Sequence, residues 1–323
     1  MMIHDTLYGD EEITSKLLID LINAPSIQRL KGIAQFGLSD RYYLKEGFSR
    51  YDHSVGVMIL LKRLSASEEE QVAGLLHDVS HTAFSHVVDW VVGSGGREDF
   101  QDNHHEEFID ASELPMILKA HGLDPKRVAD HHHYTLLEQD APDLCADRVD
   151  YALREWKGPE RECFSDLVAR NGKMVFDNQA SALVFGRLYA ELERTRWGKE
   201  DTRWRHQILA HAIMRAIELE LIEFDDFWKD DEYILQRMEA SDDAVIQMCL
   251  SILLQQDLSN LPITNEVVPH KFRYVDPPYI REDGSLGRLS EDVPEYKELM
   301  EEARRSSTKG NRGVDIDACL QIK

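Results

Sequence analysis

Apolar residues recur along most of the chain at the spacing of three and four positions that is typical of helices with one buried face. Segment 52–64 places Val55 and Ile59 on one side, and Ser67 followed by Glu70 is the cap pattern of a helix that runs on through VAGLLHDV. Further helices are predicted at 13–36 with a break near Ala24–Pro25, and at 105–120, 123–138, 140–156, 178–195, 203–224, 228–239 and 241–256.

The remaining segments break this helical pattern. Gly158–Pro159 is the clearest interruption, KMVF at 173–176 predicts a short strand, and 262–281, with four prolines, predicts loop or edge strand. The charged residues from about 300 predict a frayed end or a segment that docks on a partner. We therefore expect an all-α or mainly α fold with at most a few short strands, divided into a core (1–158), a packed helical extension (159–260) and an irregular or edge-strand C-terminal segment (261–323).

Composition and charge narrow the class of protein. The chain has 323 residues and a formal net charge of −23, which repels nucleic acid phosphates and anionic membranes and argues against a nucleic-acid-binding module. No apolar stretch approaches the roughly 20 residues of a membrane-spanning helix. The N-terminus lacks the pattern of a secretory signal, and the four scattered cysteines suggest neither a zinc ribbon nor a disulfide framework. We expect a cytoplasmic protein.

Candidate chemistry centres on His77–Asp78, which directly follow the apolar run VAGLL. Burying such groups without partners costs several kcal/mol each, and a divalent cation is a suitable partner because imidazole and carboxylate are both good ligands. His53 and Asp147 lie on two other predicted helices, so three helices could bring ligands to one point. A role for these four residues as helix caps or surface groups stays open from spacing alone.

The surrounding motifs resemble the HD superfamily. RYDHSVGV (50–57) and AGLLHDVSHTAFSHVVD (73–89), then His105–Glu106 and DRVDY (147–151), follow the order found in the branch of deoxynucleoside triphosphate triphosphohydrolases and SAM-and-HD-domain proteins. IHDTLYGD and INAPSIQRLKGIAQFG near the N-terminus are also similar to that branch. The resemblance implies a helical HD-domain bundle with a divalent metal ion (manganese, iron, cobalt, nickel, zinc or magnesium) at His53, His77, Asp78 and Asp147.

The same resemblance implies residues that act on the substrate. It places proton transfer or phosphate contact at His81, His86 and His105, with Asp89 orienting His86. If the helix continued past His77, His81 would lie on the same face four residues later. Each histidine could instead be a surface or capping residue, and His104 could replace His105. The expected substrate-binding residues are Gln35, Arg50, Arg148, Tyr151 and Glu155.

Two further runs of polar residues could be binding sites or ordinary surface. His131–His133 could extend the site to a second metal, but adjacent helical residues point in different directions, and a solvent-facing helix is the simpler interpretation. The acidic stretch 218–232 predicts a solvated helix face. In nucleotide-regulated members of the branch, an acidic residue reads guanine at an allosteric site. Asn23 stands at that place here, and Lys31 stands where arginine is usual, which speaks against activation by guanine nucleotides.

The resemblance to this branch predicts a metal-dependent phosphohydrolase that converts a deoxynucleoside triphosphate to deoxynucleoside and triphosphate. The first alternative is a phosphomonoesterase or nucleotidase acting on a small phosphate ester, and the second is a non-catalytic protein that senses nucleotides. The number of basic residues in the pocket should discriminate between the enzymes, because a triphosphate demands more of them. We expect a small phosphorylated substrate, no membrane or nucleic acid partner, and a homo-oligomer.

Overall fold

The computed structural model describes residues 1–95, 97–268 and 271–319, and most of them are helical. The helices of the first half are α1 (Lys16–Ile22), α2 (Pro25–Arg29), α3 (Asp40–Tyr43), α4 (Arg50–Arg63), α5 (Glu68–Leu76), α6 (Val87–Val91), α7 (Phe100–Ala111), α8 (Leu114–Ala120), α9 (Pro125–Ala129) and α10 (Ala146–Glu155). Those of the second half are α11 (Gln179–Leu192), α12 (Glu200–Glu218), α13 (Asp231–Glu239), α14 (Ala244–Leu253), α15 (Leu289–Asp292), α16 (Pro294–Ser307) and α17 (Ile316–Cys319).

Short turns and strands connect these helices. The 3-10 turns are η1 (Leu30–Gly32), η2 (His131–His133), η3 (Pro159–Asp166) and η5 (Phe224–Trp228), and η4 (Glu193–Trp197) is a π-helical turn. The strands are β1 (Met2–Asp5), β2 (Gly9–Glu12), β3 (Leu167–Arg170), β4 (Lys173–Phe176), β5 (Ile263–Val268), β6 (Pro278–Ile280), β7 (Leu286–Arg288) and β8 (Asn311–Val314). They form the sheets β1-β2, β3-β4-β6-β7 and β5-β8; β4 and β6 pair in parallel, and the other neighbours pair antiparallel. The fold is therefore mainly helical, with more strand than the sequence predicts.

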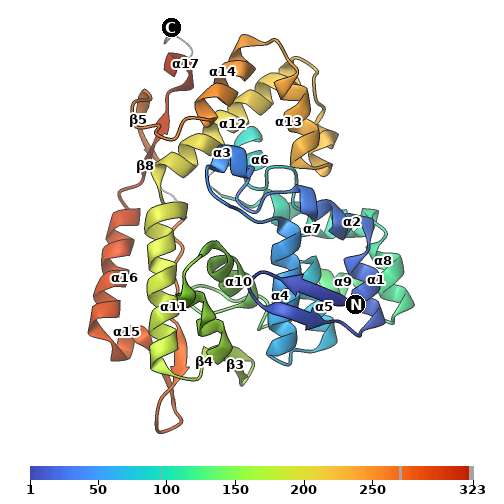
Figure 1. Cartoon of the computed structure of the whole chain (residues 1–323), viewed down its shortest axis with the longest axis vertical. Helices are drawn as coiled ribbons and strands as arrows, with labels where there is room; N and C mark the ends of the chain where they lie inside the picture. The colour runs from blue at the N-terminus through green and yellow to red at the C-terminus, as the bar shows by residue number, and fades with distance from the viewer. Residues whose placement is uncertain (96, 269–270, 320–323) are drawn as a thin grey trace.

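Helix α10 lies in the middle of the molecule (Figure 1). It contacts α4 on one side and α11 on the other, and α11 runs beside α16. Helices α12, α13 and α14 form the upper part of the view. Two buried apolar clusters support this arrangement: one joins α1, α4, α5, α10 and α11, and the other joins α3, α6, α12, α13 and α14. Each cluster draws on distant parts of the chain, and the division into three regions at 158 and 260 stays a prediction.

Most predicted helices are confirmed, and the exceptions have local causes. The prediction of a single helix at 123–138 is wrong. The Asp130 side chain accepts a hydrogen bond from the His132 N–H, and this local bond competes with helix formation. The helix predicted at 140–156 begins only at Ala146. In the loop before it, the Gln139 and Asp143 carbonyls accept hydrogen bonds from the Arg148 guanidinium instead of from helical N–H groups.

The end of the chain is also more ordered than predicted. Pro294 starts α16, and Tyr296 is buried in the core cluster that includes α11. β8 then pairs with β5, so the segment from about 300 packs on the molecule up to residue 319. Residues 320–323 of the predicted charged tail lie outside the described residues.

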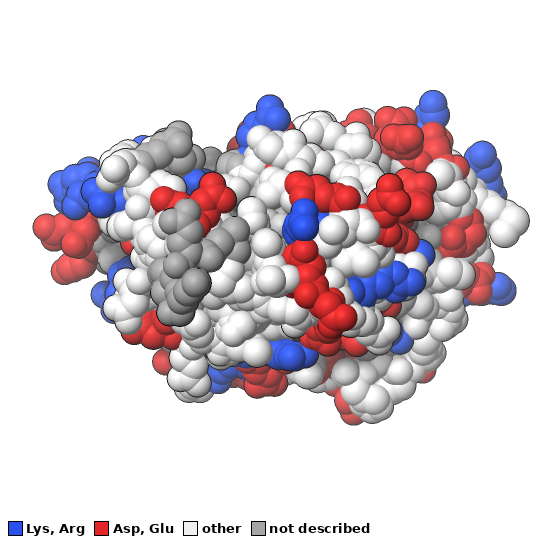
Figure 2. All heavy atoms as spheres, turned by 90° about the horizontal axis from the view of Figure 1, so that it is seen from above, with Lys and Arg blue, Asp and Glu red and all other residues white. Residues whose placement is uncertain are grey.

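The surface agrees with the acidic composition. On the face shown in Figure 2, basic side chains lie in small separate groups among acidic ones. In the described part of the chain, no helix combines the length and apolar character needed to cross a membrane.

Candidate metal centre and active-site pocket

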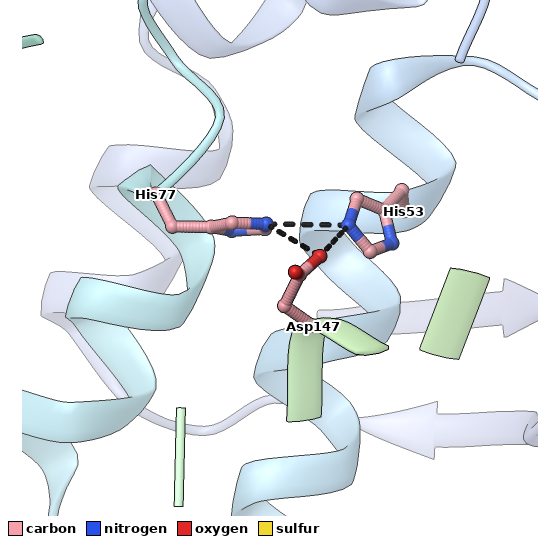
Figure 3. Close-up of side chains that lie close together, drawn as sticks. All are labelled: His53, His77 and Asp147. Carbon is pink, nitrogen blue, oxygen red and sulfur yellow. Dashed lines mark hydrogen bonds and ion pairs between the residues drawn. The ribbon is translucent and has the colours of Figure 1, made fainter. Parts of the chain in front are cut away.

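Three helices bring two imidazoles and a carboxylate to one point. His53 lies in the first turn of α4, His77 directly follows α5, and Asp147 lies in the first turn of α10. The Nε2 atoms of His53 and His77 are 3.2 Å apart, and Asp147 Oδ1 lies 2.9 Å from the first and 3.5 Å from the second. In Figure 3 the two rings point toward each other with the carboxylate between them. This convergence of donor atoms suits a cation.

The far side of each imidazole is held by a hydrogen-bond acceptor. His77 Nδ1 lies 2.7 Å from the Gly74 carbonyl, and His53 Nδ1 lies 2.7 Å from Asp150 Oδ1. Such contacts fix the tautomer that leaves Nε2 as the ligand atom. Asp150 had appeared in the sequence only as part of the DRVDY motif, without an assigned role.

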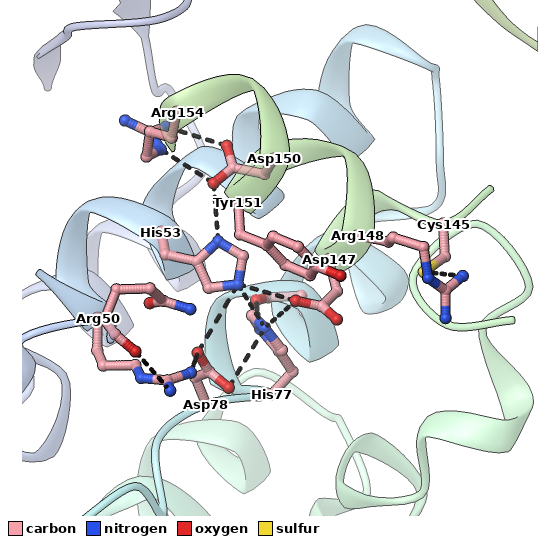
Figure 4. Close-up of polar contacts among 12 residues, drawn as sticks. Arg50, His53, His77, Asp78, Cys145, Asp147, Arg148, Asp150, Tyr151 and Arg154 are labelled. Atoms are coloured by element: carbon pink, nitrogen blue, oxygen red, sulfur yellow. Dashed lines mark hydrogen bonds and ion pairs between the residues drawn. The ribbon is translucent and has the colours of Figure 1, made fainter. Parts of the chain in front are cut away.

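Asp150 is itself anchored by Arg154. The guanidinium donates to both Asp150 oxygens at 2.9 and 3.0 Å (Figure 4). It also donates to Asp5 in the N-terminal hairpin at 2.9 Å. A Cβ on Gly56 of α4 would lie 2.0 Å from Arg154 Nη2 and 2.2 Å from Asp150 Oδ2. Glycine is therefore required there for α4 and α10 to approach.

Asp78 borders the centre but is also paired with an arginine. Its Oδ1 lies 3.6 Å from His77 Nε2 and its Oδ2 3.7 Å from His53 Nε2, while Arg50 Nη1 lies 2.6 Å from Oδ2. Arg50 also donates to Ser85 Oγ and to the Gln35 carbonyl. The structure thus brings the four sequence-predicted ligands together, with His53, His77 and Asp147 as the tight group and Asp78 as its neighbour.

The electrostatics of the centre favour positive charge. Burial opposes protonation of His77, but the carboxylates of Asp78 and Asp147 outweigh it and raise the His77 pKa to about 9. Burial likewise opposes ionisation of Asp78, yet Arg50, His77 and His81 hold the pKa of this carboxyl well below its usual range. A site built from imidazole and carboxylate groups that stabilises positive charge fits a divalent metal ion.

The segment from His77 to His86 is not helical, which corrects the expected continuation of α5. α5 ends at Leu76, and turns follow. His81 nevertheless reaches the pocket, with its Nε2 3.3 Å from Asp78 Oδ1, and burial and nearby Arg50 lower its pKa to about 3. The imidazole is therefore neutral near pH 7.

A buried carboxylate that the sequence did not reveal holds this segment. Phe84 and Ser85 both have positive φ, at 61° and 49°, a strained conformation for residues other than glycine. Asp231 accepts the Phe84 N–H at 2.6 Å and the Ala34 N–H at 2.9 Å. The acidic run 218–232 is thus not a solvated helix face: it contains a turn, the 3-10 element η5 and a buried supporting carboxylate. Only the position of Asp231 at the start of a predicted helix could have singled it out.

Of the other predicted catalytic residues, His86 lines the pocket, whereas Asp89 and His105 are buried beside it. His86 lines the pocket, with Asp89 Oδ2 3.5 Å from its Nδ1, while Asp89 Oδ1 accepts the N–H groups of Asp99 and Phe100 at the start of α7. His105 is buried behind the metal centre, where its Nδ1 lies 2.9 Å from Ser80 Oγ. His104 lines a separate cavity on the other side of α7 and so does not replace His105.

One of the three consecutive histidines faces the pocket. The His131 ring centroid lies 4.6 Å from that of His105 and 6.5 Å from that of His77. His132 and His133 are exposed on a 3-10 turn rather than a helix. No group of potential metal ligands within the described residues includes any of the three.

A second group of potential ligands, Glu138, Cys145 and Asp147, shares a residue with the metal centre. The Arg148 guanidinium already lies beside these residues, where a metal ion would otherwise bind. Its Nη1 is 3.3 Å from Cys145 Sγ, and its Nη2 is 3.6 Å from Glu138. Figure 4 shows this guanidinium beside Cys145 and away from His53 and His77.

The expected substrate-binding residues fall into two sets. A cavity of about 470 Å³ opens at the metal centre and is lined by Gln35, Arg50, Arg148 and Tyr151. Glu155 does not belong to its lining: it is buried and accepts hydrogen bonds from Tyr43 and Arg196. Sequence reasoning missed several lining residues outside the motifs, among them Trp90, Glu98, Arg203, His206 and Lys271–Tyr274.

Comparison with known proteins agrees with this site. An HD domain family model matches residues 50–155. The chain is 37% identical to YdhJ of Bacillus subtilis over 99% of this chain and 100% of that protein. It is 30% identical to the metal-dependent phosphohydrolase cns2 of Cordyceps militaris over 71% of this chain and 70% of that protein.

More distant likenesses concern parts of the chain or the fold alone. A deoxynucleoside triphosphate triphosphohydrolase SAMHD1 homolog of Dictyostelium discoideum is 32% identical over 38% of this chain and 26% of its own length. The crystal structure of a phosphohydrolase from Bacteroides thetaiotaomicron matches with a TM-score of 0.65 at 19% identity, covering 93% of this chain and 96% of that one. The chain therefore belongs to the HD-domain metal-dependent phosphohydrolases, which use a divalent metal ion.

Proposed function

We propose that this phosphohydrolase releases phosphate from a small phosphomonoester that carries an aromatic ring, such as a nucleoside monophosphate. The metal ion is held by His53, His77, Asp78 and Asp147. A divalent cation at such a centre activates water and neutralises charge that develops on a phosphoryl group. The same pocket is lined by Phe36, Trp90, Phe272 and other aromatic side chains, and these receive the organic part of the substrate.

The observation that carries this proposal is the pairing of the pocket's cations. Among the described residues, five basic ones line it, but Arg50 is paired with Asp78, Arg273 and Lys271 share Glu98, and Arg148 is bound to loop carbonyls and Cys145. Five described carboxylates line the same pocket, at Asp78, Glu98, Asp102, Glu138 and Asp147. A triphosphate would add about four negative charges to this balanced set, whereas a monoester adds about two, which the metal ion offsets.

Histidines next to the metal centre supply the remaining chemistry. His86 lines the pocket, is partly exposed and has Asp89 behind it, so it is placed to donate a proton to the leaving oxygen. Neutral His81 and the Arg50 guanidinium contact the phosphate. His105 supports the centre through Ser80, whose hydroxyl also accepts a hydrogen bond from Gln101.

Hydrolysis of deoxynucleoside triphosphates to deoxynucleoside and triphosphate is the second candidate. It is favoured by the similarity to the SAMHD1 homolog over 38% of this chain. In that reaction Arg148 would have to leave its loop carbonyls, or Arg203 would have to leave the Trp90 ring, to meet the outer phosphates.

A product assay on metal-stripped and manganese-reloaded protein separates these reactions. The substrates are nucleoside monophosphates, the four deoxynucleoside triphosphates and a generic aryl phosphate. Asp78→Ala and His86→Asn should remove turnover, while His132→Asn, at an exposed site, should leave it unchanged. Inorganic phosphate from the monophosphates supports our proposal, and inorganic triphosphate supports the second candidate. Tight manganese binding without turnover of any substrate would contradict both and leave a nucleotide sensor.

A further inference from the structure

The wall of the pocket opposite the HD motifs comes from the C-terminal part of the chain. Lys271, Phe272, Arg273 and Tyr274 all line the cavity, and we call these four residues the C-terminal wall. They lie far outside the region 50–155 that the HD domain model matches. The metal centre therefore derives from the shared domain, and this wall derives from sequence outside it.

Ion pairs fix the C-terminal wall to the loop before α7. Arg273 Nη2 donates to Glu98 Oε2, and Lys271 Nζ lies 3.5 Å from the same oxygen. Burial disfavours ionisation of Glu98, but Arg273, His86 and Lys271 outweigh it and hold the Glu98 pKa well below its ordinary range. Because the arginine and the carboxylate are each 22% exposed, the pair is partly shielded from water, and breaking it would leave two poorly solvated charges.

The other end of the C-terminal wall is equally well anchored. The Tyr296 hydroxyl donates to the Val275 carbonyl at 2.6 Å, and the Asp276 N–H donates to the Pro142 carbonyl at 2.9 Å. Val275 itself is buried in the core. The four wall residues are thus held between the α7 loop and the buried Tyr296 of α16.

The chemistry of the C-terminal wall suits a planar ring. Phe272 and Tyr274 stack with their centroids 5.2 Å apart and an angle of 9° between the rings. Arg304 lies over Tyr274, with its guanidinium carbon 5.1 Å from the ring centroid. Trp90, with Arg203 5.0 Å from its ring, adds a further aromatic surface to the same pocket. Aromatic surfaces bind nucleobases by stacking with little dependence on base identity.

We propose that the C-terminal wall is the surface by which this enzyme selects phosphomonoesters that carry an aromatic ring. It binds the aromatic ring of the substrate, and Glu98 positions it through Arg273. This inference rests on the proposed function, since it assigns the ring of the phosphomonoester to a particular part of the same pocket. Phosphate chemistry at the metal centre does not depend on it.

Two substrates that differ in the ring test this assignment. For Phe272→Ala, we expect KM to rise about tenfold for adenosine monophosphate with kcat nearly unchanged, because binding of the ring is lost while the charges around the phosphate stay intact. For glycerol 2-phosphate, which has no ring, kcat/KM should not change. Arg273→Ala should also raise KM for adenosine monophosphate. Arg187→Ala, a change at an exposed arginine of α11, serves as the matched control.

Restoring the ion pair between Glu98 and Arg273 with reversed charges shows whether the pair positions the C-terminal wall or whether its loss disturbs the structure in general. The double charge reversal Glu98→Arg with Arg273→Glu should recover most of the affinity that either single reversal loses. Equal losses on both substrates, or a rise in KM that the double reversal does not recover, would overturn the positioning role of Glu98 and Arg273. No change for Phe272→Ala and Arg273→Ala would overturn the C-terminal wall as the ring site.

Equilibrium dialysis with adenosine separates this inference from the proposed function. Wild-type protein that binds adenosine, with binding weakened about tenfold by Phe272→Ala, supports the C-terminal wall even if adenosine monophosphate is not hydrolysed. Hydrolysis of the monophosphate with adenosine binding unaffected by the wall variants would uphold the reaction and reject the ring site. If the protein neither binds adenosine nor hydrolyses the monophosphate, both the ring site and the proposed reaction are rejected.

Discussion

At the scale of single residues, the imidazole ligands of the metal centre are oriented by hydrogen bonds at their Nδ1 atoms, on the side away from the centre. His53 presents Nε2 to the centre because Asp150 holds its Nδ1, and Arg154 in turn holds Asp150. The sequence identified His53 and Asp147 because they occur in motifs of a known order. It did not predict the role of Arg154 or Asp5, because their contacts join residues 149 positions apart and no local pattern marks such a pair.

The behaviour of Asp150→Asn tests this support. We expect metal affinity to fall about 10- to 100-fold, the usual cost of losing a carboxylate behind a histidine ligand. The Asn amide retains an oxygen toward Arg154, so the fold should persist. Manganese binding followed by calorimetry, together with circular dichroism, measures both effects. Unchanged affinity in a folded variant would show that Asp150 serves stability alone.

At the scale of elements, the turn segment 77–86 matters most, because it carries His77, Asp78, His81 and His86. Its two consecutive positive-φ residues are held by Asp231 at the start of α13 and by Arg50 through Ser85. Sequence periodicity predicted a helix that runs on through Val79, whereas α5 ends at Leu76. The buried hydrogen bonds that override it come from a helix about 150 residues later, and periodicity carries no information about them.

Asp231 should make stability depend on pH in a defined direction. Burial raises its pKa to about 7, although the N–H groups of Ala34 and Phe84 oppose the shift. The folded state therefore holds the proton more tightly than the unfolded state. The contribution of protonated Asp231 is complete below the ordinary aspartate pKa near 4 and is lost as pH rises toward 7, with a slope of at most about 1.4 kcal/mol per pH unit.

Urea unfolding of the wild type and Asp231→Asn between pH 4 and 8 checks this window. The wild type should lose stability relative to the variant as pH rises from 4 to 7, and the difference should level off above 7. A difference that is constant over the range would mean that Asp231 is ionised throughout in the folded protein.

At the scale of the whole molecule, the C-terminal segment is part of the enzyme's core rather than a frayed tail. Tyr296 of α16 packs against Gly186 of α11, where a Cβ would lie 2.7 Å from the tyrosine ring, and its hydroxyl binds the Val275 carbonyl. The charge of the residues from about 300 had predicted a frayed end or a segment that docks on a partner. Its few apolar residues are spaced to bury one helix face, which a composition-based interpretation overlooks.

Tyr296 therefore allows a test that spans the molecule. Tyr296→Ala should lower the free energy of unfolding by about 3–5 kcal/mol, as large-to-small changes in a core do. Tyr296→Phe should cost about 1–3 kcal/mol, since it leaves the Val275 carbonyl without this donor. Both values come from urea unfolding monitored by tryptophan fluorescence. A loss well under that range for the alanine variant would mean that α16 is only loosely attached.

The origin of the pocket wall also has a consequence for synthesis in the cell. All four candidate ligands lie before residue 148, whereas the wall is formed by residues 271–274 and Asn311 also lines the pocket. A nascent chain that has emerged only to about residue 260 carries the metal-binding motifs without the surface that surrounds the substrate. We therefore expect the complete pocket to form only when translation is nearly finished.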